Sequence, residues 1–136
     1  MKLTFVDAGV LIAAARGGNA QAARAMEILD DPDREFAASP FLRLEVLPQA
    51  LFNKREPEVK FYEAFFASVQ HWVTDLNAVT DIAMREASAN GIHAVDALHI
   101  AAAITAGASE LITAEKRSRS IHRTRAIKVV TIHPEH

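Results

Sequence analysis

Residues 2–13 read KLTFVDAGVLIA, a nearly continuous run of large and β-branched apolar residues that one acid, Asp7, interrupts. Such a run is typical of a strand buried on both faces, as in a parallel sheet that helices cover. We therefore expect a central strand here, with Asp7 at or near its end. The acid lies inside the apolar stretch, which is wrong for a signal peptide.

Strand and helix patterns alternate along the rest of the chain. Further strand patterns occur at residues 35–38, 72–74, 109–113 and 127–132. Signals for the ends of helices between them are Asn19, Ser39-Pro40, Pro57, Asn77, Asn90-Gly91 and Gly107. Pro48 lies inside one helical pattern and should kink or end that helix near Glu45. No hairpin turn joins two strands, so the alternation predicts an α/β fold: a parallel sheet of four to five strands with helices on both faces.

Length and composition exclude several classes of protein. The chain has 136 residues, half of them apolar, which predicts one globular domain over residues 1–136. No apolar run approaches the roughly 18 residues that span a bilayer, so we expect a cytoplasmic protein with no membrane association. Cysteine is absent, which excludes disulfides and thiolate metal sites and leaves oxygen and imidazole as metal ligands.

The charges are distributed unevenly along the chain. Residues 116–136 carry six Lys and Arg against one acid, Glu135, which gives this segment a net charge of +5 and the rest of the chain −7. Such an asymmetry favours a polyanionic partner such as RNA, although a solvated loop has the same composition. The candidate RNA-binding residues are Lys116, Arg117, Arg119 and Arg123.

Four acids stand among apolar neighbours or at the expected rim of the sheet: Asp7, Glu45, Asp96 and Glu115. A buried carboxylate needs a cation, a metal or helix-end amides, and the carboxyl ends of parallel strands form one rim with the following helices. Carboxylates converging there form the oxygen-rich site that Mg²⁺ or Mn²⁺ prefers, as in a nuclease. Plainer interpretations stay open, since Asp96 can be a helix N-terminal carboxylate and Glu45 can pair with Arg43 or with an arginine elsewhere in the chain.

The segments around these acids resemble the four acidic blocks of the PIN domain family. They read VDAGVLIAA (6–14), LRLEVLP (42–48), VDALHIAAA (95–103) and LITAEK (111–116). The length and the block spacing resemble the VapC-type toxins of bacterial toxin–antitoxin pairs. The resemblance implies a metal-dependent endoribonuclease, commonly a homodimer that a small antitoxin inhibits. By position, it implies Mg²⁺ or Mn²⁺ as cofactor, with Asp7, Glu45, Asp96 and Glu115 as catalytic metal ligands and Thr113 as a supporting hydroxyl.

Two residues depart from the family pattern. Gly9 stands where a small polar residue is usual, so one hydrogen bond to the first carboxylate or to substrate is expected to be missing. Glu115 stands where Asp is usual, and the polar run KRSRS follows it. A catalytically impaired PIN-like module that binds RNA or a partner is therefore one alternative. A Mg²⁺-binding receiver-type switch domain is a weaker one, because the adjacent acids that it requires after the first strand are absent.

Two further features have a functional and a structural interpretation. His93 and His99 flank Asp96, and His99 lies on the same helical face, so an Asp–His metal pair is conceivable, although a core or rim histidine is commoner. The apolar stripe between Val59 and Val69 predicts a core face or, if exposed, a dimer or antitoxin surface.

Overall fold

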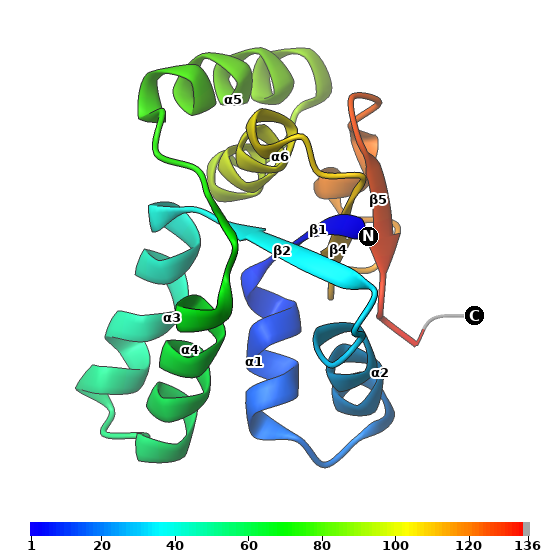
Figure 1. Ribbon diagram of the computed structural model, residues 1–136. Coiled ribbons are helices and arrows are strands. Elements are labelled where there is room, and N and C mark those ends of the chain that lie inside the picture. Colours follow the sequence, from blue (N-terminus) through cyan, green and yellow to red (C-terminus); the bar gives the residue numbers. More distant parts are fainter. Residues whose placement is uncertain (135–136) are drawn as a thin grey trace.

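The computed structural model describes residues 1–134 and contains a five-stranded parallel sheet between two layers of helices (Figure 1). The strands are β1 (Lys2–Val6), β2 (Arg34–Ala38), β3 (His71–Trp72), β4 (Glu110–Thr113) and β5 (Lys128–Thr131), in the order β3-β2-β1-β4-β5. All four neighbouring pairs are parallel. The predicted α/β class is confirmed; Glu135 and the end of the predicted domain lie outside the described residues.

Helices cover both faces of the sheet, as predicted. They are α1 (Ala8–Arg16), α2 (Ala20–Leu29), α3 (Pro40–Phe52), α4 (Glu56–Ser68), α5 (Leu76–Asn90) and α6 (Ala94–Ala106), with a 3-10 turn, η1 (Ser120–Arg123). Figure 1 shows α1 to α4 on one side of the sheet and α5 with α6 on the other. Within residues 1–134, no helix has both the length and the apolar composition needed to cross a membrane.

The first strand is shorter than the apolar run suggested. It ends at Val6, and residues 8–13 belong to α1 instead of the strand. Asp7 marks the change, because its backbone is extended and its Oδ1 accepts a hydrogen bond from the amide of Val10 at 3.3 Å, as a helix N-cap does. An apolar run fits a buried helix as well as a buried strand, so periodicity alone did not locate the boundary.

Three other local predictions need correction. Helix α3 continues through Pro48 to Phe52. Pro48 cannot donate to the carbonyl of Leu44, but Leu44 is exposed, so water can reach that carbonyl. Helix α5 begins after Asp75, which is a favoured cap two residues before the predicted Asn77, and Oδ1 of Asp75 accepts from an amide of the first turn. Strand β3 covers His71–Trp72 instead of residues 72–74.

The order of the strands positions the site. From β1 the chain continues to β2 and β3 on one side, and then to β4 and β5 on the other side of β1. In open α/β sheets, ligands bind at the carboxyl ends of the strands where this order reverses, which here is between β1 and β4. Asp7 directly follows β1, and Glu115 follows β4. The aromatic residues of the stripe on α4, Tyr62, Phe65 and Phe66, are buried, so the stripe belongs to the core.

Candidate active site

A cavity of about 180 Å³ lies at the carboxyl ends of β1 and β4. The N-cap of α1, α3, the first turn of α6 and the residues after β4 each contribute one acid to it. These acids are Asp7, Glu45, Asp96 and Glu115. The structure therefore brings together all four acids that the sequence singled out.

Asp7 is the most enclosed of the four, with 5% of its surface exposed. Its Oδ2 accepts a hydrogen bond from the Thr113 hydroxyl, and that hydroxyl accepts one from the Glu115 amide at 3.0 Å. Burial raises the pKa of Asp7 to about 6, although the hydrogen bonds from Thr113 and Val10 lower it. Thr113 thus contacts Asp7 directly, while its supporting role in catalysis stays a prediction.

Asp96 is half-buried in the first turn of α6. In the part of the chain that the structure describes, its carboxylate has no hydrogen-bond partner. Burial raises the pKa of Asp96, and the negative charges of Glu115 and Glu45 raise it further. A carboxylate stabilised mainly by the helix dipole would show the opposite shift. Burial, followed by repulsion from the neighbouring carboxylates, therefore dominates the pKa of Asp96.

Glu45 is held by a residue that the sequence did not assign to it. Its Oε1 lies 2.6 Å from Nε2 of His99, a side chain on α6 that is 1% exposed. Among residues 1–134 this is the ion-pairing partner of Glu45, so the alternative pairing with Arg43 does not occur. No local sequence pattern pairs Glu45 with His99, because they lie far apart in the chain. The apolar neighbours of both were the only indication that they lie close together.

Glycine at position 9 is explained by steric crowding and not by the chemistry of the site. A Cβ built on Gly9 would lie 2.8 Å from Cβ of Ala114, closer than two carbon atoms pack. The first turn of α1 therefore approaches the residue after β4 so closely that a side chain at position 9 would force one of them to move. The absent polar side chain follows from this close approach.

Two of the four basic residues predicted to contact RNA, Arg119 and Arg123, line a second cavity of about 220 Å³. Asp96 and Glu115 form the wall that it shares with the first cavity. Nε of Arg119 lies 3.4 Å from the Glu115 carboxylate and offsets one of the clustered negative charges. The other two basic residues directly follow Glu115, are exposed and line neither cavity.

A further buried acid, Glu110, lies at the opposite end of β4 and belongs to another kind of site. Nη1 of Arg34 donates to its carboxylate at 2.7 Å, and Lys2 lies 3.5 Å away. Burial alone would raise the pKa of Glu110, but the hydrogen bond from Arg34 and the nearby cations lower it overall. Glu110 is thus compensated by protein cations, whereas Asp7 and Asp96 are not.

The donor set of the first cavity fits a hard divalent cation. All of its acidic ligand atoms are carboxylate oxygens, and burial raises the pKa values of Asp7 and Asp96 because it disfavours the charged form, which a bound cation would stabilise. Within residues 1–134, however, no three acidic or histidine side chains lie close enough to share a metal ion as they stand. Cation binding would therefore require the carboxylates to move closer together than they stand, where Glu45 contacts His99 and Glu115 contacts Arg119.

Solved structures of toxin–antitoxin complexes share this fold. A VapBC2 complex from Rickettsia felis bound to a DNA fragment from its promoter is 15% identical, with 95% of this chain and 98% of that chain covered and a TM-score of 0.71. For a toxin–antitoxin complex from Klebsiella pneumoniae the identity is 20%, the coverage 96% and 98%, and the TM-score 0.70. A DNA-bound VapBC from Salmonella typhimurium is 16% identical, with 97% of this chain and 99% of that chain covered and a TM-score of 0.69. At these identities the likeness shows the fold alone.

No curated protein matches the chain significantly by sequence. The family model of the PIN domain, by contrast, matches residues 4–125. This range contains all four acids that line the first cavity and both arginines that line the second. The chain therefore belongs to the PIN domain family.

Proposed function

We propose that the protein is a metal-dependent endoribonuclease and the toxin of a toxin–antitoxin pair, which cleaves RNA phosphodiester bonds with Mg²⁺ or Mn²⁺. The observation that carries the proposal is the convergence of four carboxylates on one cavity at the switch point of the sheet. Membership of the PIN domain family supports nuclease activity. The structural neighbours, which are toxin–antitoxin complexes, support the toxin role.

Each of the four acids would contribute a carboxylate to the cation site. Asp7 and Asp96 are the enclosed carboxylates with raised pKa values, and Glu45 and Glu115 complete the set from two other elements. A divalent cation bound there would act as a Lewis acid and lower the pKa of a water for attack on the phosphodiester. Thr113 keeps the Asp7 carboxylate in place, because its hydroxyl hydrogen bonds to Asp7 and is itself oriented by a backbone amide.

The second cavity would bind a phosphate next to the one that is cleaved. Four carboxylates repel an RNA backbone, so a nearby cationic site is needed to offset that repulsion. Arg119 and Arg123 supply it beside Asp96 and Glu115. A phosphate there would compete with Glu115 for Arg119 and so release the carboxylate toward the first cavity. Lys116 and Arg117 would add longer-range attraction for the same strand.

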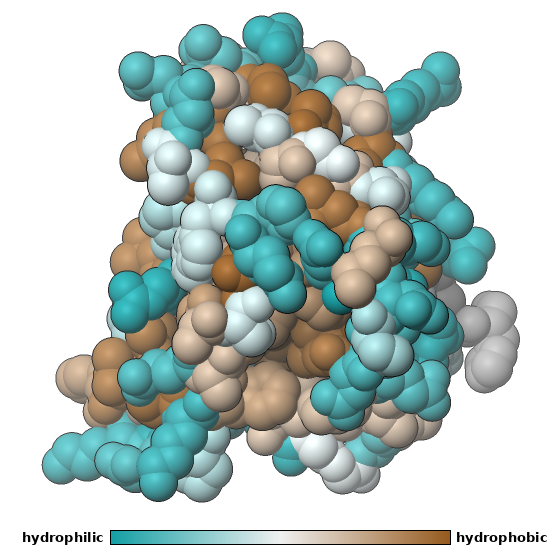
Figure 2. Space-filling view, in the orientation of Figure 1, coloured by the Kyte–Doolittle hydropathy of each residue, from teal (hydrophilic) through white to brown (hydrophobic). Residues whose placement is uncertain are grey.

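An exposed apolar face on α3 supports a protein partner. Leu44 and Leu51 are 68% and 55% exposed and line a groove of about 370 Å³, and Phe52 beside them is 85% exposed. Figure 2 shows hydrophobic surface along the side of the molecule that α3 forms. Clustered apolar side chains of this kind mark protein interfaces. Since the structural neighbours are toxin–antitoxin complexes, we assign this face to an antitoxin segment.

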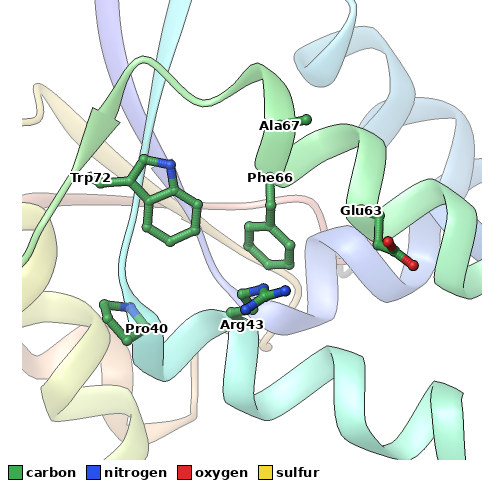
Figure 3. Close-up of a pocket in the computed structure, with 6 residues that line it drawn as sticks. All are labelled: Pro40, Arg43, Glu63, Phe66, Ala67 and Trp72. Carbon is green, nitrogen blue, oxygen red and sulfur yellow. The ribbon is translucent and has the colours of Figure 1, made fainter.

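A second groove adjoins this face, because Pro40 and Arg43 line both. Its volume is about 400 Å³, and the rings of Trp72 and Phe66 stand opposite Pro40 and Arg43 (Figure 3). An apolar side chain of the antitoxin would pack against these rings. Sedimentation of the chain alone distinguishes this assignment from the predicted homodimer. A monomer would leave the face free for the antitoxin, whereas in the homodimer a second copy would cover it. That dimer and the cytoplasmic location stay predictions.

The decisive experiment is cleavage of a panel of structured RNAs by purified protein with Mg²⁺ or Mn²⁺ and with EDTA. We expect metal-dependent cleavage that Asp7→Asn and Asp96→Asn abolish and that Asp81→Asn, a change of an exposed acid on α5, leaves intact. Cleavage that persists in both site variants would refute the proposal. Mn²⁺ binding without any cleavage would instead favour the catalytically impaired RNA- or partner-binding module.

A further inference from the structure

We infer that His99 is a positioning residue for Glu45, which it holds by one carboxylate oxygen so that the other oxygen is directed to the cation site. The inference rests on the proposed function and extends it to a residue outside the carboxylate set. Nε2 of His99 lies 2.6 Å from Oε1 of Glu45, and the imidazole is almost completely enclosed. Both residues line the first cavity, one from α6 and one from α3.

The surroundings of the imidazole determine which nitrogen carries the hydrogen. Nδ1 of His99 is buried and has no hydrogen-bond partner within the described chain. The ring packs against Phe5, with 5.9 Å between ring centroids. A hydrogen on Nδ1 would be a buried donor without an acceptor, and a bare Nε2 would face a carboxylate oxygen. The geometry therefore requires a hydrogen on Nε2, which donates to Glu45.

The same geometry excludes His99 as a direct metal ligand. Its Nε2 is bonded to Glu45, and its Nδ1 is enclosed in the core, so neither nitrogen has a free lone pair in the cavity. His93, the other histidine near Asp96, lines the second cavity and not the first. His99 therefore does not form the Asp–His metal pair considered from the sequence, and it acts on the cation site through Glu45.

Glu45 needs such a partner because, like Glu115, it is far less enclosed than Asp7. Its side chain is 40% exposed, and holding a glutamate in one rotamer costs side-chain conformational entropy. His99 is rigid by contrast, since it is buried one turn after Asp96 on α6. The hydrogen bond therefore ties Glu45 to the helix that carries Asp96 and sets the spacing between the two carboxylates. Partners that orient metal ligands in this way typically change metal affinity about 10–100-fold.

Two substitutions distinguish the effect of the hydrogen-bond donor of His99 from the effect of its ring. His99→Phe keeps the ring and removes the donor, whereas His99→Gln places an amide N–H near the position of Nε2. We expect Mn²⁺ affinity, measured by calorimetry, to fall about 10–100-fold in His99→Phe and to recover at least partly in His99→Gln. The stability of His99→Phe in EDTA should not fall with it, because an unpaired buried nitrogen is removed. His71→Phe is the matched control, since His71 pairs with Glu35 at 2.6 Å away from both cavities.

A double-mutant cycle tests whether His99 acts through Glu45. In a Glu45→Ala background, His99→Phe should change Mn²⁺ affinity less than about twofold. An equal loss in both backgrounds, or wild-type affinity in His99→Phe, would overturn the inference while leaving the nuclease proposal standing. If wild-type protein neither binds Mn²⁺ nor cleaves RNA, the proposed function fails first. Should His99→Phe not fold, His99→Gln compared with the shorter His99→Asn decides, because rescue by Gln alone requires the donor at Nε2.

Discussion

Replacing Asp7 with Asn should stabilise the metal-free protein while abolishing the proposed activity. Asp7 is 5% exposed, and burial raises its pKa from 3.8 to about 6. Because this pKa is higher in the folded than in the unfolded chain, the stability that protonated Asp7 contributes is fully present below about pH 3.8 and is lost as the pH rises through about 6. At neutral pH the folded protein therefore contains a buried charge that destabilises it.

The expected gain follows from the two pKa values and the local hydrogen bonds. The difference between 3.8 and about 6, at about 1.4 kcal/mol per pH unit, corresponds to about 3 kcal/mol at neutral pH. Asn remains a favourable N-cap for α1, but its amide nitrogen cannot accept a hydrogen bond, so one of the bonds from Thr113 and Val10 is lost. That loss costs about 1 kcal/mol. A net gain of about 1–2 kcal/mol, or about 3–10 °C in Tm, remains.

Urea unfolding in EDTA, from about pH 4 to about pH 7.5, measures this gain. The advantage of Asp7→Asn should be largest at the higher pH and should shrink toward the lower, and Asp81→Asn should track the wild type throughout. Added Mn²⁺ should stabilise the wild type and not Asp7→Asn, since only a bound ligand shifts unfolding. If Asp7→Asn proves less stable than the wild type at about pH 7.5, or its advantage is the same at every pH, the reasoning about the buried charge is wrong.

Three other results are expected from the same structure. Gly9→Ala should cost about 1–3 kcal/mol in urea unfolding, because its Cβ would lie 2.8 Å from that of Ala114; adding Ala114→Gly should restore most of the loss, and additive losses would contradict the close contact. Glu110→Gln should lower the free energy of unfolding by about 1–3 kcal/mol at neutral pH. Because the pKa of Glu110 is lowered from 4.5, this difference in stability from the wild type should vanish as the pH falls through the lowered pKa. A difference that is the same at every pH would argue against the ion pairs. Arg119→Gln should raise the KM for RNA and flatten its salt dependence with kcat little changed, whereas Arg125→Gln, outside both cavities, should do neither; identical effects would mean that the second cavity binds no phosphate.

Local signals accounted for most of the element boundaries that were predicted well. Asn19 accepts from the amide of Ala22, and Ser39 accepts from that of Leu42, so both cap helices as the sequence indicated. Gly107 ends α6 in a left-handed conformation, again as predicted. Each of these devices involves residues at most a few positions apart, so their pattern is visible in the sequence.

The α/β class, the parallel sheet and the four acids of the candidate site could be predicted from the sequence, because apolar runs, helix caps and acids among apolar neighbours are properties of adjacent residues. The partner of each acid could be found only in the folded structure: Asp7 contacts the Thr113 hydroxyl, Glu45 contacts His99, and Glu110 pairs with cations at the opposite end of the sheet. The folded structure also showed that α1 packs so closely against the residue after β4 that a side chain at position 9 would force one of them to move. Such contacts join residues far apart in the chain, and their distances depend on how whole helices and strands pack, which no local pattern encodes.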